Sequence, residues 1–289
     1  MSYEYKMHNG QTVQSAPYGG THSDELSATM TVDKLSTGKT RITVKLTNTV
    51  EGETYRIHAH DAADASTTPN GTPYNETPNS AVFAQTVTGT GGDATVSQES
   101  DMTFEAVTTT YEGFFVVHDP LQAISTTDIS TYLTVGGFAR AQAASSLKSK
   151  TYTNAFNTGQ VVSTAPYNGT HATNFSADLK IQELANGKSR VTVKLNNTVN
   201  GQTYRVHSHD AADASTTPNG TPYNESPNTD VCAMGIAGNG ATALSAQLSS
   251  KSYTELTTTY EGFFVVHDPL QAISTVNINT YLVLSSFAR

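Results

Sequence analysis

Two short segments indicate the fold of this chain: TYRIHAH at residues 54–60 and GFFVVHD at residues 113–119. β-Branched and aromatic residues dominate both, and the first alternates between apolar and polar side chains, as a strand with one buried face does. The sequence therefore predicts an all-β chain, built as an antiparallel barrel or sandwich. Further segments of the same kind are LSATMTVDKL (26–35), TRITVKLTNTV (40–50), MTFEAVTTT (102–110) and TYLTVGGF (131–138).

The whole pattern occurs twice, at an offset of 149 residues. Each copy is long enough to bury a core of its own, and both copies end in the tripeptide FAR. A stretch of small and polar residues, AQAASSLKS, lies between them and is typical of a linker. We therefore expect two tandem domains, at residues 1–140 and 150–289, joined by a linker at residues 141–149.

The two copies have diverged unevenly. Residues 108–126 are identical to their counterparts at all 19 positions, and residues 58–76 differ from theirs only at Ala59, which is Ser208 in the second copy. Residues 80–107, by contrast, agree at 7 of 28 positions. This pattern indicates a constraint on the segments that carry histidines, with local gene conversion as the alternative explanation.

Eight of the nine histidines form matched pairs, and three of the four pairs lie on predicted strands. Because side chains alternate along a strand, His58 and His60 share one face, and His118 points away from the core-facing Phe115 and Val117. If the two strands approach each other, three imidazoles meet on the outside of the barrel and can bind one metal ion. The alternative is a former metal site that no longer binds an ion and persists as a hydrogen-bonded network on the surface. The second copy repeats the set at His207, His209 and His267.

The segments TYRIHAHDAADAS and GFFVVHDP, with PYN between them and STYLTVGGFA after them, resemble the Cu/Zn superoxide dismutase family. The tandem arrangement is similar to that of copper-only superoxide dismutase-repeat proteins. The resemblance covers nearly all of each repeat. It implies two Greek-key antiparallel β-barrels or sandwiches, with copper held by the three histidines of each repeat.

The chain departs from this family at several positions. Tyr74 and Tyr223 stand where the family has its bridging histidine, and the loop that follows contains no histidine. The resemblance therefore implies a copper site and no zinc site. The family's active-site arginine falls near Tyr132 and Tyr281, and its disulfide cysteines are missing.

These departures make enzymatic activity uncertain. Arg56 and Arg205 lie two residues before the first histidine of each triad, on the same face by alternation. They are the candidates to supply the positive charge that the missing arginine gives the family. We expect at most weak superoxide dismutation.

Other groups could complete each site. Tyr74 would bind a metal as a phenolate, or it packs as a neutral phenol, since a free tyrosine has a pKa of about 10. His22, in the turn-like PYGGTH, either joins the site or makes local hydrogen bonds. Asp61 and Asp119 each follow a triad histidine and either orient the imidazoles or are solvated loop acids. In the second copy, Tyr223 corresponds to Tyr74 and His171 corresponds to His22.

Composition excludes several classes of partner. The 289 residues carry a net charge of −9 and no basic cluster, so no nucleic acid partner is expected. No apolar run approaches the length of a membrane span. The single cysteine, Cys232, excludes a disulfide within the chain. Sparse charge and abundant Ser, Thr and Asn favour an extracellular or cell-surface protein.

Asn-x-Ser/Thr sequons make N-glycans possible if the protein is secreted in a eukaryote. The turn-forming preference of asparagine is the simpler explanation for those in PNGTPYNE. The sequons are at Asn70, Asn75, Asn168, Asn174, Asn196, Asn219 and Asn224.

Two functions fit these observations. The first is an extracellular, tandem superoxide dismutase-like protein with a three-histidine copper site in each repeat. The alternative is a structural repeat unit of an extracellular filament, matrix or coat protein, whose partners are neighbouring copies or further repeats and whose metal site is modified or vestigial. No G-x-S-x-G elbow, P-loop or dinucleotide fingerprint points to another enzyme class.

Overall fold

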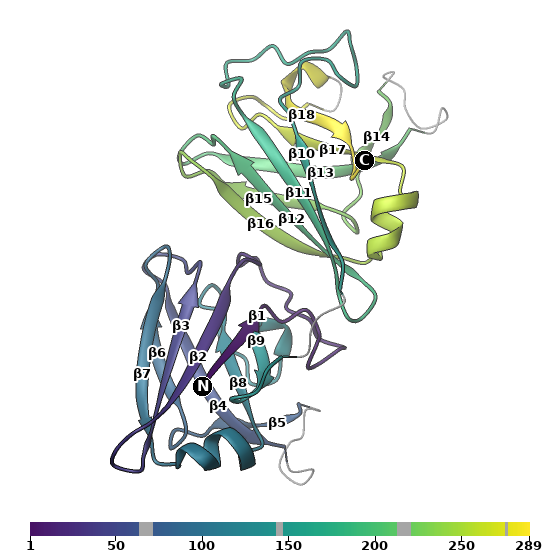
Figure 1. The fold of residues 1–289 in the computed structure, drawn as a ribbon. Helices are drawn as coiled ribbons and strands as arrows, with labels where there is room; N and C mark the ends of the chain where they lie inside the picture. Colours follow the sequence, from purple (N-terminus) through teal and green to yellow (C-terminus); the bar gives the residue numbers. More distant parts are fainter. Residues whose placement is uncertain (64–71, 143–146, 213–220, 275–276) are drawn as a thin grey trace. The chain divides into compact units, whose positions relative to one another are not determined.

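The computed structural model describes residues 1–63, 72–142, 147–212, 221–274 and 277–289. The chain divides into two compact units, Met1–Ser146 and Leu147–Arg289, which are coloured purple to teal and teal to yellow in Figure 1. Each unit is built of antiparallel strands, which confirms the expected all-β class.

The first unit consists of two antiparallel sheets. In its described part, one sheet has the strand order β1-β2-β3-β7 and the other the order β5-β4-β8-β9, with β6 also paired to β4. The strands are β1 (Ser2–Lys6), β2 (Ser27–Lys34), β3 (Thr40–Thr47), β4 (Thr54–Ala62), β5 (Tyr74–Pro78), β6 (Ala84–Thr88), β7 (Ala94–Ser100), β8 (Gly113–His118) and β9 (Tyr132–Gly137). A short π-helix, η1 (Ala106–Thr110), precedes β8, and a 3-10 turn, η2 (Ile129–Thr131), precedes β9.

The second unit repeats this arrangement strand by strand. Its described sheets have the orders β10-β11-β12-β16 and β14-β13-β17-β18, with β15 paired to β13. The elements are β10 (Ser149–Asn154), β11 (Ser176–Glu183), β12 (Ser189–Asn196), β13 (Thr203–Ala211), β14 (Tyr223–Pro227), β15 (Ala233–Ala237), β16 (Ala243–Ser249), η3 (Glu255–Thr259), β17 (Gly262–His267), η4 (Ile278–Thr280) and β18 (Tyr281–Ser286). β10 begins at Ser149, the last residue of the segment expected as a linker.

The core of each unit lies between its two sheets. In the first unit Tyr55, Ile57 and Ala59 of β4 and Phe115 and Val117 of β8 all face this core and are fully buried. They occupy alternate positions, so the opposite face of β4 and β8 carries the histidines. The predicted alternation along both strands is therefore confirmed.

The outer face of the β4–β8–β9 sheet is also covered. A second apolar cluster forms there around Tyr74, Val116 and Tyr132, with Val13 packed against it. The segment after β1 runs along β9, where the amide of His8 donates to Leu133 O at 2.7 Å and the hydroxyl of Thr12 donates to Val135 O at 2.8 Å. Tyr74 and Tyr132 of this cluster lie against the rings of His60 and His118, which are both buried.

The expected strand at residues 102–110 is wrong, because part of this segment forms the π-helix η1. Val107 anchors the turn in the core, while the hydroxyl of Thr108 donates to Phe104 O at 2.8 Å. A threonine that bonds the carbonyl four residues earlier offers the backbone an alternative to a sheet partner. The run of β-branched residues therefore gave a false strand signal.

The first and last strands of each unit meet through a pair of residues that differs between the copies. In the first unit the hydroxyl of Tyr5 on β1 donates to Gly137 O on β9 at 2.8 Å, and its ring covers Gly136, where an added Cβ would lie 3.0 Å from the ring. In the second unit Asn154 and Ser285 take the places of Tyr5 and Gly136, and the serine hydroxyl donates to Asn154 Oδ1 at 2.6 Å. The first unit fills this junction with one large side chain against a glycine, and the second unit fills it with two side chains of intermediate size.

We expect Tyr5→Asn and Gly136→Ser each to destabilise the first unit, the first by losing a buried ring and the second by overpacking. Together they recreate the pair found in the second unit. The double variant should therefore be more stable than the sum of the single effects predicts, with a coupling energy of about 0.5–3 kcal/mol. Urea unfolding of the four proteins of this cycle measures the coupling, and strictly additive effects would contradict it.

Candidate metal centres

Three imidazoles meet on the outer face of the first unit. His58 and His60 come from β4 and His118 from the end of β8, and one nitrogen of each lies within 4.8 Å of the others. The ring centroids of His58 and His60 are 5.7 Å apart, and those of His58 and His118 are 5.1 Å apart. Each unit thus holds a cluster that could bind a metal ion, because His207, His209 and His267 form the same group in the second unit.

Strand register brings these side chains together. β4 and β8 pair antiparallel with His58 opposite Val116, and His118 lies two residues beyond Val116 on the same face. The pairing of β8 with β9 shifts register between Val117 and His118, and such a bulge changes the direction of the side chain at a strand end. The triad therefore depends on correct pairing between segments more than 50 residues apart in the chain.

The nitrogens of the triad are left free for a ligand. His58 Nδ1, His60 Nε2 and His118 Nδ1 are buried and have no hydrogen-bond partner in the described part of the chain. His60 Nδ1 donates to the backbone oxygen of Asn75 at 2.7 Å, which leaves the lone pair on Nε2. The second unit repeats this with His207 Nδ1, His209 Nε2 and His267 Nδ1, and with a 2.7 Å bond from His209 Nδ1 to Asn224 O.

Burial also keeps the imidazoles neutral. Burial is the main reason that the pKa of His58 falls to about 4 and that of His118 to about 3, with smaller contributions from the neighbouring histidines of the triad and from Arg56. The pKa of His60 is lowered for the same main reason, against a hydrogen bond to Asn75 that raises it. Neutral imidazole is the form that binds metal ions, so the triad is ready to bind at neutral pH.

Two tyrosines border the triad. The ring of Tyr74 lies 5.2 Å from that of His60, the ring of Tyr132 lies 4.5 Å from that of His118, and the two tyrosine rings stack at 6.2 Å. Burial raises the pKa of Tyr74 far above its usual range, and its buried hydroxyl makes no hydrogen bond to a described residue. Tyr74 is thus a neutral phenol packed beside His60. Tyr223 and Tyr281 lie in the same way beside the second triad.

His22 lies on the other side of β4, away from the triad. Its Nδ1 donates to Ser23 O at 3.1 Å, so its Nε2 accepts from the hydroxyl of Tyr55 at 2.6 Å. Because Tyr55 faces the core, His22 makes the local hydrogen bonds of a structural histidine. His171 makes the same contact, with Tyr204 at 2.7 Å.

Neither acid that follows a triad histidine bonds an imidazole of the triad. Asp119 is buried and accepts from Tyr18, from the amide of Leu121 and from the side-chain amide of Gln122. Asp61 accepts from Asn79 at 2.7 Å and from Tyr111 at 2.9 Å. Asp119 thus fixes the loop after β8 and reaches the triad only through its neighbour in the chain.

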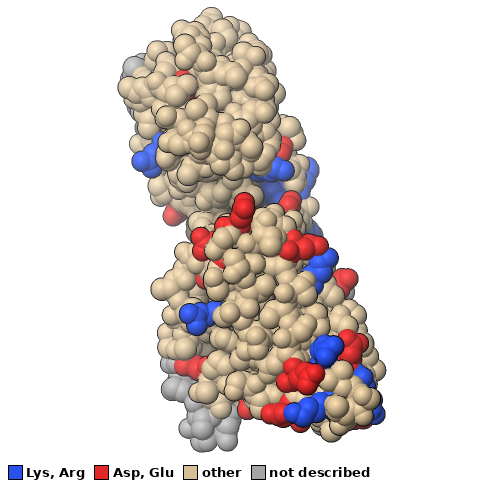
Figure 2. Space-filling model, turned by 90° about the vertical axis from the view of Figure 1, so that its left-hand side faces the viewer, with Lys and Arg blue, Asp and Glu red and all other residues tan. Residues whose placement is uncertain are grey.

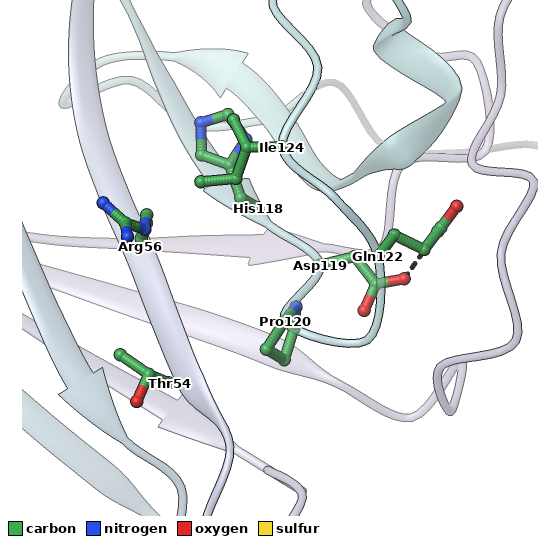
Figure 3. Close-up of a pocket in the computed structure, with 7 residues that line it drawn as sticks. All are labelled: Thr54, Arg56, His118, Asp119, Pro120, Gln122 and Ile124. Carbon is green, nitrogen blue, oxygen red and sulfur yellow. Dashed lines mark hydrogen bonds between the residues drawn. The ribbon is translucent and has the colours of Figure 1, made fainter.

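A pocket of about 250 Å³ opens beside His118 (Figure 3). Arg56 and His118 reach it from the neighbouring strands β4 and β8, and the loop after β8 forms the other wall. Arg56 thus lies beside the triad, on the face that strand alternation predicts. The pocket is lined by Thr54, Arg56, His118, Asp119, Pro120, Gln122 and Ile124.

The sequence did not indicate that Asn75 would orient His60 or that Gln122 would orient Asp119. Asn75 acts through its backbone, so its identity gives no signal. Both residues nevertheless lie in the two segments that the copies share almost unchanged. The near-identity of the two copies in these segments is therefore the sequence feature that indicates a role for Asn75 and Gln122.

The remaining sequence features lie away from the triads. Cys232 is buried and without a partner in the described chain, and burial raises its pKa to about 12. Asn168 and Asn174 are exposed, while Asn70 and Asn219 lie outside the described residues. Figure 2 shows sparse charges of mixed sign on one face. No helix within the described ranges is long and apolar enough to cross a membrane.

Comparison with known proteins identifies no family for this chain. No protein-family model matches this chain, and no curated protein matches it either.

We expect the free energy of unfolding of the metal-free protein to fall as the pH drops below about 6.5, the pKa of a free imidazole. The fold holds the pKa of His58 at about 4 and that of His118 at about 3, so the unfolded chain binds protons that the folded chain does not. Each imidazole contributes a slope of at most about 1.4 kcal/mol per pH unit. Urea unfolding at a series of pH values measures it. His118→Gln with His267→Gln should flatten the curve, and an unchanged slope would contradict the assignment.

We expect Tyr74→Phe, combined with Tyr223→Phe, to keep the metal stoichiometry of the wild-type protein. A phenol whose pKa is raised by burial stays protonated and contributes packing only. Loss of an unbonded buried hydroxyl should leave stability unchanged or raise it slightly. Metal analysis and the visible spectrum of the copper-loaded protein check this. A phenolate-to-copper band that disappears in the variant would show direct ligation instead.

Proposed function

We propose that each unit of this chain is a superoxide dismutase-like domain that holds one copper ion on three imidazoles. The observation that carries the proposal is the cluster of His58, His60 and His118. Their ligand atoms lie within 4.8 Å of one another, and each ring has one buried nitrogen without a hydrogen-bond partner among the described residues. Leaving such groups unbonded in the interior costs free energy, and a bound metal ion would supply the missing partner.

The strand order supports the family part of the proposal. The chain crosses from one sheet to the other between β3 and β4, again between β6 and β7, and again between β7 and β8. Such connections between two packed antiparallel sheets are those of a Greek-key sandwich. The strand with the paired histidines lies beside the VVH strand, and that strand lies beside the last one, which is the arrangement that the resemblance implies.

The donor set supports copper. Three neutral imidazoles without a carboxylate suit Cu, Zn and Ni, and the affinity of divalent ions for such a site peaks at Cu(II). Imidazole also binds Cu(I), so the site could hold copper in both oxidation states. His60 is oriented by Asn75 O, the kind of outer contact that fixes metal-binding imidazoles.

The surrounding residues favour slow turnover at most. Bound copper would supply one-electron chemistry with superoxide. Arg56, which lines the pocket beside His118, would attract an anion to that face. Tyr74 stands where the family has its bridging histidine, and its tightly held proton makes it a poor donor to a reduced product. We therefore propose a copper-binding protein with weak dismutase activity.

We expect the reconstituted chain to bind two copper ions, since the triads are alike. His58→Ala with His60→Ala should leave one, and adding His207→Ala with His209→Ala should leave none. His22→Gln with His171→Gln is the matched control, because these histidines face the core, and it should keep both ions. Metal analysis and copper EPR give the count, and a superoxide-consumption assay gives the rate.

Binding of neither copper nor zinc would refute this proposal. It would favour the structural repeat unit, in which the triads are vestigial. Equal loss of copper in the His22 and His171 control would show that the binding site is not the triad.

A further inference from the structure

The pocket beside His118 is larger than a diatomic substrate requires. Its volume is about 250 Å³, whereas an apolar cavity of about 150 Å³ can hold a benzene molecule. All of its lining residues belong to the first unit, and it lies between β4 and the loop after β8 (Figure 3). Its size therefore admits a single ring that carries a polar group.

The pocket offers one cation that no described residue neutralises. Arg56 is exposed and makes no hydrogen bond or ion pair with any residue that the structure describes. Asp119 also lines the pocket, but it is only 3% exposed and its two oxygens already accept three hydrogen bonds. A guanidinium with free donors beside a satisfied carboxylate favours an anionic ligand, and a carboxylate fits its fork.

Two of the other lining residues are apolar. Pro120 and Ile124 line the pocket (Figure 3). Leu121 and Ile124 are 44% and 47% exposed, and their counterparts Leu270 and Ile273 are 45% and 56% exposed. These four are most of the large apolar side chains left exposed among the described residues. Exposed apolar groups at a pocket mouth mark a surface that an apolar ligand covers.

The second copy preserves this lining completely. All seven lining residues recur unchanged at the offset of 149 residues, although the intervening residues 80–107 keep only 7 of 28. The triad by itself requires His118 but not Arg56, Gln122 or Ile124. The lining is therefore constrained together with the triad in both copies.

We propose that this pocket binds a small organic monocarboxylate with an apolar body of about one ring. The carboxylate pairs with Arg56, and the apolar body lies against Pro120 and Ile124. The ligand needs no metal ion for these contacts, so the inference stands apart from the proposed copper function.

Benzoate is the probe, titrated into the full-length chain after all metal has been removed. We expect saturable binding at two sites per chain by calorimetry, with shifts of the Ile124 and Ile273 methyl signals by NMR. Benzamide, which lacks the charge, and formate, which lacks the ring, should each bind at least tenfold more weakly. Arg56→Gln with Arg205→Gln should weaken benzoate at least tenfold, while Lys39→Gln with Lys188→Gln removes the same charge from exposed turns and should not.

Three outcomes would overturn the proposal. These are the absence of benzoate binding, an unchanged affinity in the arginine variant, and formate binding as tightly as benzoate, which would show a site for inorganic anions only. Copper titration of the same samples tests the copper proposal separately from the carboxylate proposal. The arginine variant keeps all six triad histidines and should still bind two copper ions if the copper proposal holds, whatever benzoate does.

Discussion

The structure of each unit depends on the two faces of one strand. Along β4, Tyr55, Ile57 and Ala59 face the core, while His58 and His60 face the opposite side. The spacing of side chains along a strand allows no intermediate arrangement, so a slip of one residue would place both imidazoles in the core and expose the apolar side chains. The free energy gained by burying the apolar face therefore also fixes the direction of the histidine face, and core packing holds the triad in register.

Part of the outer face is unusual because it is buried as well, as His60, Val116 and His118 are. Most antiparallel sheets leave one face to water, but here a loop after β1 and the segment around η2 cover it. Burial favours the neutral imidazoles, and three of their nitrogens have no hydrogen-bond partner among the described residues. The same cover explains the two tyrosines. In the sequence Tyr74 and Tyr132 are separate departures from a family pattern, whereas in the structure they stack on each other beside the triad and act as one packing unit.

The two copies show which features can change. At the junction of first and last strands, Tyr5 and Gly136 are replaced by Asn154 and Ser285 with a new hydrogen bond. Near the start of the outer loop, His8 bonds Ala16 O at 2.8 Å, and Asn157 in the second copy keeps a donor to the matching Ala165 O at 3.4 Å. At these two places, different residue types fill the same space or donate to the same backbone oxygen. The triad and the lining of its pocket recur without change, as expected where several side chains must meet one ligand.

The sequence alone determined the features that follow from local periodicity. Alternation in residues 54–60 and 113–119 predicted the strands, their core-facing residues and the shared face of the histidines, because a strand fixes side-chain direction residue by residue. Tertiary structure alone decided the rest. Whether β4 and β8 are neighbours is a matter of long-range pairing, and the pairing carries His118 to His58. The segment expected as a strand forms η1, where a threonine hydroxyl donates to a backbone oxygen of the preceding turn. His22 lies on the core side of β4, where it bonds the hydroxyl of Tyr55. The burial that makes the imidazoles neutral comes from loops whose path no local pattern encodes, so the shared face of the histidines could be predicted but their environment could not.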